Sequence, residues 1–263
     1  MSFNVRLFDL YNWSDNKSTR NKILDFIKET DANVLCMQEF FNSNDKHYFN
    51  TLDTLLKVQK ARNVHDVYSA MMHDGLNQFG IATMSAESIG KRGIINLDSA
   101  GHNMAIYTDL QIQGETLRVM NLHLASIHLS EMEDDIESHL EENDQEKQLN
   151  DAKLLWKRLV GGFKNRAYQA DVIRAAIDSS PHKVIVCGDF NDTPGSYAYH
   201  TIRGNMNDAF IERGKGAGTT YLGLFPTLRI DFILCDPSIE IHSFTTEGIR
   251  LSDHRPLVAE IGL

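Results

Sequence analysis

Short apolar runs alternate with amphipathic stretches along most of this chain. Runs rich in β-branched residues are typical of strands, and apolar residues spaced three or four apart are typical of helices. On this basis we predict strands over 2–8, 33–37, 66–72, 78–84, 103–109, 116–122, 184–187, 229–235, 240–246 and 256–261. Helices are predicted over 17–30, 46–61, 150–178 and 196–203, the third of them interrupted at Gly161-Gly162.

The order of these elements predicts an α/β fold. Strand-rich blocks alternate with helices, which favours two sheets packed together with helices outside them. The strands within residues 66–122 follow one another too closely for helical crossovers, so this block is expected to be antiparallel. No internal linker or sustained shift in composition is visible, which predicts a single domain over residues 1–263.

Two segments depart from the alternation. Residues 131–146 carry nine acidic side chains and no Lys or Arg, and the apolar residues Met132, Ile136 and Leu140 follow at helical spacing. We therefore expect an acidic helical insertion over about 125–150, with a lid or a partner-binding element as the alternative. Residues 204–226 are rich in glycine and are expected to form a loop.

The composition, with 42% hydrophobic and 24% charged residues, is that of a soluble globular protein. No apolar run approaches the ~20 residues of a membrane span, and no signal peptide is visible. Residues 2–8 already have the pattern of the middle of a strand, so we expect the N-terminus to be truncated. The compartment, and any export or membrane tethering of the parent chain, therefore stays open.

Cysteine placement and net charge argue against a disulfide or zinc framework and against tight binding of nucleic acid. Cys36, Cys187 and Cys235 each lie within an apolar run, so they are expected to be buried free thiols rather than a disulfide framework or a zinc site. The net charge of −10 argues against tight, non-specific binding of nucleic acid. It still leaves room for a nuclease, because a bound metal can supply local positive charge.

Polar side chains interrupt the apolar runs at strand ends in six places. They are Asn4, Glu39, Asn121 with His123, Asp189 with Asn191, Asp231, and Asp253 with His254. In the loop after strand 184–187, Gly188 ends the apolar run and Pro194 prevents an early return to regular structure. Each place has an ordinary alternative, such as a helix cap, a satisfied core histidine, a polar turn or, for Asp231, a pair with Arg229. All six would have to be structural for that interpretation to hold throughout.

These residue types share one chemistry. Oxygens of Glu, Asp and Asn suit a hard cation such as Mg²⁺ or Mn²⁺. A His backed by an Asp has its charged form favoured, and Asn and His donors can hold the oxygens of a phosphoryl group as negative charge builds. The set therefore predicts metal-assisted hydrolysis of a phosphoester.

In chain order these residues resemble the motifs of the endonuclease/exonuclease/phosphatase superfamily, which includes pancreatic deoxyribonuclease, abasic-site endonucleases, neutral sphingomyelinases, inositol polyphosphate 5-phosphatases and deadenylases. The matching motifs are Asn4, Gln38-Glu39, Asn121-Leu-His123, Gly188-Asp-Phe-Asn191, Arg229-Ile-Asp231 and Ser252-Asp-His254. The resemblance covers nearly the whole chain. It implies a four-layer α/β sandwich, with two mixed or antiparallel sheets face to face and helices on both outer sides, and a Mg²⁺-dependent hydrolase.

By position, the resemblance implies that Glu39 is the principal metal ligand and that Asn4 and Asp253 lie near the metal. One departure concerns abasic-site endonucleases, which carry an Asp where this chain has Arg6 and a Tyr in the motif where it has Asn121-Leu-His123. Both differences argue against abasic-site repair. They favour the deoxyribonuclease, sphingomyelinase or uncharacterised bacterial branches.

The resemblance also implies the catalytic roles. Asp189 is expected to orient or deprotonate the attacking water, and Asn191 to bind phosphate. His254, paired with Asp231, is expected to be the essential histidine. His123 is expected to contact the scissile phosphate.

Other interpretations carry less weight or stay open. Ser252, Asp253 and His254 are adjacent in extended chain, where neighbouring side chains point to opposite faces, so they cannot form a serine-hydrolase triad. Residues 214–219 lack the spacing of a nucleotide-binding loop. A nuclease acting on DNA or RNA and a catalytically silent binding protein on the same fold stay as alternatives. The substrate is undecided between a small phosphoester, a lipid headgroup and nucleic acid, and no protein partner is indicated.

Overall fold

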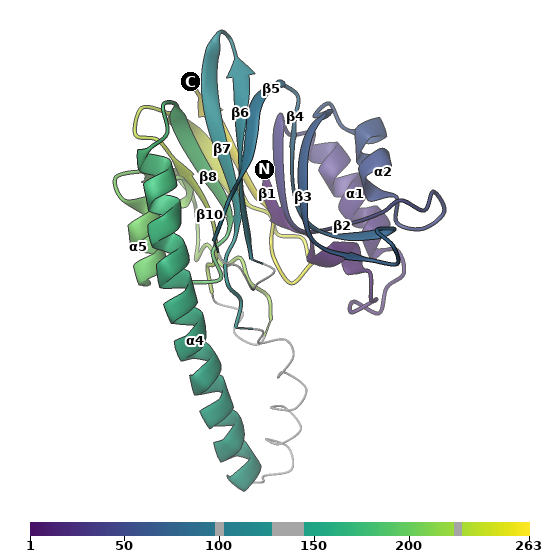
Figure 1. Cartoon of the computed structure of the whole chain (residues 1–263), viewed down its shortest axis with the longest axis vertical. Coiled ribbons are helices and arrows are strands. Elements are labelled where there is room, and N and C mark those ends of the chain that lie inside the picture. The colour runs from purple at the N-terminus through teal and green to yellow at the C-terminus, as the bar shows by residue number, and fades with distance from the viewer. Residues whose placement is uncertain (98–102, 128–144, 224–227) are drawn as a thin grey trace.

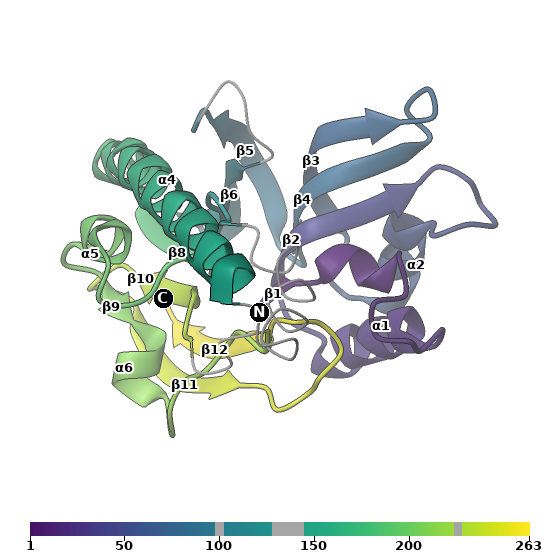
Figure 2. The ribbon, with the colours of Figure 1, turned by 90° about the horizontal axis from the view of Figure 1, so that it is seen from below.

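The computed structural model describes residues 1–97, 103–127, 145–223 and 228–263. Two six-stranded sheets lie at its centre (Figure 1). Helices α1 (Thr19–Thr30) and α2 (Thr51–Val58) cover the outer side of one sheet, and α4 (Gln145–Asp178) and α5 (Tyr197–Arg203) cover the outer side of the other (Figure 2). The four-layer α/β sandwich is therefore confirmed.

Each sheet has one parallel pair of strands at its centre. The first sheet has the order β11-β12-β1-β2-β4-β3, and the second has the order β5-β6-β7-β8-β10-β9. The strands of the first sheet are β1 (Ser2–Asn4), β2 (Val34–Ser43), β3 (Asn63–Met72), β4 (Asn77–Ser85), β11 (Glu240–Thr246) and β12 (Leu257–Gly262). Those of the second are β5 (Ser88–Ile95), β6 (Met104–Ile112), β7 (Glu115–His123), β8 (Lys183–Asp189), β9 (Asn207–Asp208) and β10 (Asp231–Cys235). β1 pairs in parallel with β2, and β7 pairs in parallel with β8. β3 pairs antiparallel with β4, and β6 pairs antiparallel with β7, as predicted. β5 adds a further antiparallel pair with β6.

Strand β8 shows how the sequence pattern produces the layers. Val184 and Val186 lie in the core beneath α4, together with Ile173 of that helix. Ile185 and Cys187 point to the opposite face and lie in the core between the two sheets, because successive side chains of a strand alternate. Both faces of β8 are buried, which matches its continuous apolar run.

The core between the sheets also contains all three cysteines. Cys36, Cys187 and Cys235 are buried and free, as predicted. On the outer side of the first sheet, Ile23 and Ile27 of α1 are fully buried, which matches their helical spacing in the sequence.

The first two predicted strands have the wrong length. The strand predicted over 2–8 ends at Asn4, because residues of the following turn η1 (Arg6–Asp9) have φ angles between 43° and 59°, which no strand adopts. The strand predicted over 33–37 continues to Ser43 through an irregularity at Gln38 and Glu39.

Helix α4 is continuous from Gln145 to Asp178, so the predicted interruption at Gly161-Gly162 is wrong. Gly162 faces a crowded surface, where an added Cβ would lie 2.4 Å from a side-chain atom of Ile127 and 2.9 Å from Nη1 of Arg166. The glycine therefore permits close packing instead of ending the helix.

Other elements were shortened or missed. The helix predicted over 46–61 spans only Thr51–Val58, with Asn50 capping it. β5 was not predicted, and residues 204–226 contain β9 and the short helix α6 (Ala209–Arg213) in addition to loop. Residues 128–144 of the predicted acidic insertion lie outside the described residues. Within the described chain, no helix has the length and apolar character to cross a membrane.

Candidate active site

Three predicted site residues form a row across the second sheet. His123 at the end of β7 is opposite Asp189 at the end of β8, and Asp189 is opposite Asp231 at the start of β10. The two aspartates are almost completely buried. The row lies where the parallel strands β7 and β8 end, which is the position that α/β folds use for chemistry.

Gly188 makes this row possible. Its φ of +140° is accessible to glycine, and an added Cβ would lie only 2.0 Å from the carbonyl oxygen of Leu122 on β7. Strand β8 can therefore approach β7 closely at the residue before Asp189.

The first sheet supplies Asn4 and Glu39. Asn4 ends β1 and is opposite Gln38 of β2. Glu39 follows at a β-bulge, where β2 has one more residue than β4 between successive pairs, and its φ is +48°. A non-glycine residue held in this conformation carries backbone strain, which is found most often at functional sites. About a third of the Glu39 side chain is exposed.

The two sheets meet through Asn4. Its Nδ2 donates to Glu39 Oε1 and to Asp189 Oδ2, both at 3.0 Å. Asn121 lies deeper, where its Oδ1 accepts from Gln38 Nε2 at 2.6 Å and its Nδ2 donates to the Ala82 carbonyl at 3.0 Å. Asn121 therefore ties the sheets together behind the site and does not line it.

His254 is held against the row by Asp231. Its Nδ1 is hydrogen bonded to Asp231 Oδ2 at 2.9 Å, which leaves Nε2 facing Asp189 Oδ2 at 3.7 Å. Asp231 does not pair with Arg229, because Arg229 binds Asp208 at 2.8 Å. The alternative interpretation of Asp231 as a structural partner of Arg229 is therefore wrong.

Burial and nearby charges shift two pKa values in this cluster. Burial alone would lower the pKa of His254, but the carboxylates of Asp231 and Asp189 outweigh it and hold that pKa well above 6.5. Burial raises the pKa of Asp189, and the charge of Asp231 adds to this effect, while His254 and His123 oppose it. His254 thus favours its protonated form, and Asp189 is a stronger base than an exposed aspartate.

His123 and Asn191 complete the wall around Asp189. His123 Nε2 lies 3.8 Å from Glu39 Oε1 and 3.7 Å from Asp189 Oδ2. Asn191 has a φ of +51°, and its backbone N–H donates to Asp189 Oδ1 at 2.7 Å. Its Nδ2 donates to the Leu124 carbonyl at 3.0 Å.

Asp253 lies beside this cluster and makes different contacts. Its Oδ2 is 3.3 Å from Nε of Arg6, and its Oδ1 lies 3.1 Å from the Ser252 Oγ. The same hydroxyl donates to the Asn4 carbonyl at 2.9 Å, which fixes the segment before β12 against the end of β1. The structure thus gathers Asn4, Glu39, His123, Asp189, Asn191, Asp231 and His254 around one point and places Asp253 at its edge.

Two parts of the cluster offer ligands to a metal. Ligand atoms of Asp189, Asp231 and His254 lie within 4.8 Å of one another. These three residues are buried, however, and Asp231 and His254 already bind each other. The partly exposed carboxylate of Glu39 fits Mg²⁺ better, because this ion prefers oxygen ligands and retains several of its waters.

Two residues that support His254 and Asp231 were not predicted. Thr220 Oγ1 accepts hydrogen bonds from the N–H groups of Ile230 and Asp231 at 3.0 and 3.1 Å, which fixes the start of β10. The buried ring of Tyr221 packs edge to face with His254, with ring centroids 5.4 Å apart. Both lie within the glycine-rich 204–226 segment, where no sequence pattern distinguishes them from other loop residues.

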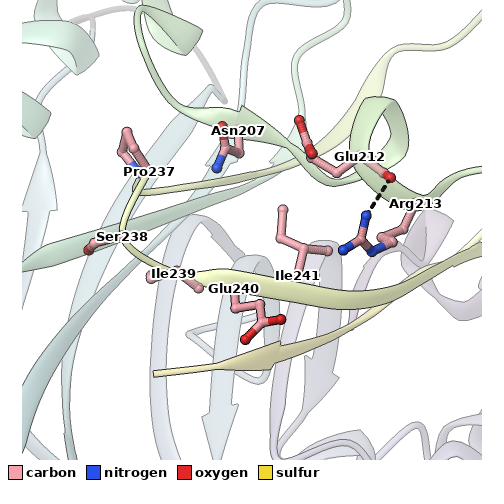
Figure 3. Close-up of a pocket in the computed structure, with 8 residues that line it drawn as sticks. All are labelled: Asn207, Glu212, Arg213, Pro237, Ser238, Ile239, Glu240 and Ile241. Carbon is pink, nitrogen blue, oxygen red and sulfur yellow. Dashed lines mark hydrogen bonds between the residues drawn. The ribbon is translucent and has the colours of Figure 1, made fainter.

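The pocket in Figure 3, of about 310 Å³, lies away from this cluster. Its lining includes Asn207, which pairs with Cys235 at the end of β10, whereas Asp231 begins that strand. None of the predicted site residues lines it.

Comparisons with known proteins show the family and the fold. The model of the Endonuclease/Exonuclease/phosphatase family matches residues 1–254. The fold is similar to an endonuclease/exonuclease/phosphatase from Bacteroides vulgatus (TM-score 0.71, 20% identity, 100% of this chain and 97% of that chain). It is also similar to a mannosyl-6-phosphatase from Bacteroides thetaiotaomicron (TM-score 0.69, 16% identity, 100% and 98%) and to the human Nocturnin catalytic domain with bound sulfate (TM-score 0.67, 18% identity, 99% and 91%). A comparison with curated proteins gives no match.

Proposed function

The chain belongs to the endonuclease/exonuclease/phosphatase family, and we propose that it is a divalent-metal-dependent hydrolase that cleaves phosphoester bonds by in-line attack of water on phosphorus. One observation carries the proposal. The buried carboxylate oxygen Oδ2 of Asp189 lies 3.7 Å from Nε2 of both His123 and His254 and accepts a hydrogen bond from Asn4. A buried acid among two histidines and an amide donor is suited to proton transfer and to binding phosphate.

Glu39 would hold the cation, Mg²⁺ or Mn²⁺, with Asn4 and Asp253 nearby. When bound, the cation would neutralise negative charge that develops on the phosphoryl oxygens. Because the Glu39 side chain is partly exposed, a cation could reach its carboxylate from solvent. The bulge in β2 keeps this carboxylate beside Asn4 and His123. The amide of Asn4 donates hydrogen bonds to both Glu39 and Asp189, so the same side chain would position the metal ligand and the base that activates water.

Asp189 would orient the attacking water and accept its proton. The raised pKa that burial gives Asp189 makes it a better proton acceptor than an exposed aspartate. The Asn4 and Asn191 hydrogen bonds hold both of its oxygens in place, which reduces the motion needed to reach a productive geometry.

His254 would place a proton near the phosphoryl oxygens. Asp231 fixes the ring through Nδ1 and leaves Nε2 toward the substrate side of Asp189. The pKa of His254 above 6.5 favours the imidazolium, which stabilises negative charge in the transition state. His123 and Asn191 would add further donors to the same phosphoryl group.

The substrate of this site is a small phosphoester, a lipid headgroup or nucleic acid. The net charge of −10 weighs against long nucleic acid as the substrate. The two alternatives, a DNA or RNA nuclease and a catalytically silent binding protein, are tested by the experiment below. A silent protein on this fold would have lost some of the seven clustered side chains, yet all of them are present.

The test is hydrolysis of a diester reporter, a monoester reporter, DNA, RNA and sphingomyelin in Mg²⁺, Mn²⁺ or EDTA. We expect turnover of at least one ester with metal and loss of that turnover in EDTA. The preferred ester assigns the substrate class, and cleavage of DNA or RNA above all others would select the nuclease. Turnover that persists in EDTA contradicts the proposal, and absence of metal binding would favour the silent binding protein.

A further inference from the structure

An exposed aromatic pair lies beside the site, in the segment that joins β1 to α1. Tyr11 and Trp13 pack edge to face, with ring centroids 5.1 Å apart. The guanidinium carbon of Arg6 lies 4.6 Å from the centroid of the Trp13 ring, and Arg6 Nε is 3.3 Å from Asp253. A continuous chain of contacts therefore connects the edge of the site to the aromatic pair. In Figure 1 this segment and the segment before β12 both lie at the lower end of the sheets, where β7 and β8 finish.

Packing within the protein leaves much of both aromatic rings exposed to solvent. Tyr11 is 60% exposed and Trp13 is 46% exposed. Single exposed apolar residues are common on proteins, but two adjoining rings next to a candidate active site form a surface that a ligand can cover. The contact with Arg6 occupies only part of the Trp13 surface.

The backbone holds the segment in one arrangement despite unfavourable angles. The four residues of η1, together with Asn12 and Asp15, have positive φ although none is glycine. Phe8 anchors the turn, since it is fully buried and packs edge to face with Phe40 at 5.8 Å. The Arg6 N–H donates to Asn4 Oδ1 at 3.1 Å, which ties the segment to a residue that also binds Asp189. Such strain persists only where the surroundings enforce it, and it is concentrated at ligand clamps and active sites.

We propose that Trp13 and Tyr11 form a subsite for a ring on the alcohol side of the substrate phosphoester, either a nucleobase or a sugar ring. The proposal rests on the proposed function and names its substrate class more narrowly. The flat face of a nucleobase stacks on an aromatic ring, and the C–H face of a sugar ring packs against one by apolar contact. The cation of Arg6 on the same tryptophan disfavours a second cation such as a choline headgroup, because like charges repel, so a neutral ring on an anionic phosphoester fits better.

The first test measures binding without turnover. The chain has two tryptophans, so Trp156→Phe leaves Trp13 as the only one. In EDTA, this variant is titrated with adenosine 5′-monophosphate, mannose 6-phosphate and glycerol 3-phosphate while Trp13 fluorescence is recorded. We expect saturable quenching or a spectral shift with at least one ring-bearing phosphate, which identifies the ring class, and none with glycerol 3-phosphate. If no ring-bearing phosphate changes Trp13 emission, the subsite is refuted even if the protein hydrolyses esters.

The second test measures substrate selection. In Trp13→Ala, the ratio of kcat/KM for the ring-bearing ester to kcat/KM for the ring-free ester should fall about 5- to 150-fold, mainly through KM, which is the range for one stacking contact. Trp13→Phe should restore most of the ratio because it keeps an aromatic face. Trp156→Ala removes the other exposed tryptophan, 69% exposed on α4, and should leave the ratio unchanged. An equal loss for both esters in Trp13→Ala would contradict the subsite and assign Trp13 to holding Arg6.

Discussion

Asp189 ends strand β8, Asp192 lies three residues later in the loop that follows, and both are buried, yet their surroundings differ. Asp192 Oδ2 binds Nε of Arg166 on α4 at 2.9 Å, and almost none of either side chain is exposed. Asp189 faces Asn4 and two histidines, and within the described residues no Arg or Lys pairs with it. The two residues have the same side chain and similar burial, and their partners in the structure distinguish them.

Two other buried aspartates of the second sheet also differ from Asp189, because each of them is paired with an arginine. Asp109 binds Arg118 at 2.7 Å and Asp208 binds Arg229 at 2.8 Å, so a permanently charged guanidinium neutralises each acid. Around Asp189 the partners are histidines, whose charge depends on protonation, and Asp231 adds further negative charge. We expect the fixed pairs to stabilise the fold, and we propose that the cluster around Asp189 exchanges protons and binds a cation.

The largest effect is expected from removing the histidine of the cluster. His254→Ala should lower kcat/KM by at least ~10²-fold, the lower range for a general acid–base group, because Asp231 and Asp189 lose their proton-carrying partner. His182→Ala is the matched control, since His182 Nε2 also lies near an aspartate, 3.9 Å from Asp109, but in a fixed pair. It should keep near-normal kcat/KM. Similar losses in both variants would erase the distinction between the two kinds of aspartate.

Breaking a fixed pair should affect stability and not turnover. Asp109→Ala leaves the Arg118 guanidinium buried without its partner, which should cost about 3–5 kcal/mol of unfolding free energy. Urea denaturation measures this loss, and kcat per folded molecule should stay within about twofold, since Asp109 lies outside the cluster. Asp189→Asn should reverse the pattern, with turnover lost and a smaller change in stability. A stable but inactive Asp109→Ala protein would contradict the comparison.

The pH dependence of stability should distinguish His254 from the fixed pairs. The pKa of His254 is raised above 6.5 in the folded protein. The contribution of protonated His254 to the unfolding free energy is therefore fully present below pH 6.5, and it is lost as the pH rises through the folded-state pKa. In EDTA, the Tm of the parent protein should therefore exceed that of His254→Gln most near pH 6, and the difference should shrink toward alkaline pH. A difference in Tm that grows with pH would contradict this prediction, because it would mean that folding lowers the pKa of His254.

The smallest effects concern two neighbouring glycines of α4. Gly161 has no atom within 4 Å of an added Cβ, so Gly161→Ala should raise the unfolding free energy by about 0.5–1 kcal/mol through helix propensity. Gly162→Ala should lower it, because the added methyl would displace Ile127 and the Arg166 guanidinium that binds Asp192. Equal stabilisation by both substitutions would show that the Arg166–Asp192 pair tolerates displacement.

The sequence predicted much of this arrangement because the site residues stand at strand ends. The apolar run of β8, ended by Gly188, located Asp189, and the order of the motifs indicated the family and its four-layer fold. The bulge that turns Glu39 into the site was not visible, because it depends on how β2 pairs with β4. The continuity of α4 was missed for a similar reason, since packing on Ile127, not local propensity, decides the role of Gly162.

Partners distant in the sequence were equally hidden. Asp192 pairs with Arg166 across 26 residues, and Thr220 fixes Asp231 across 11 residues without any local pattern. Residue types and spacing therefore indicated which chemistry to propose for the chain. Tertiary contacts distinguish the acids to which we assign it from other buried acids.

The most direct measurement follows Mg²⁺ or Mn²⁺ binding and ester hydrolysis in the same preparation, for the parent protein and for Glu39→Gln, with Asp109→Asn as the control. Calorimetry records the metal affinity, and a reporter ester records the rate as metal is returned after EDTA treatment. We predict that the rate rises with metal occupancy in the parent and in Asp109→Asn, and that Glu39→Gln weakens binding and turnover together. Full activity of the parent protein without metal, or unchanged metal affinity in Glu39→Gln, would contradict this assignment of the site.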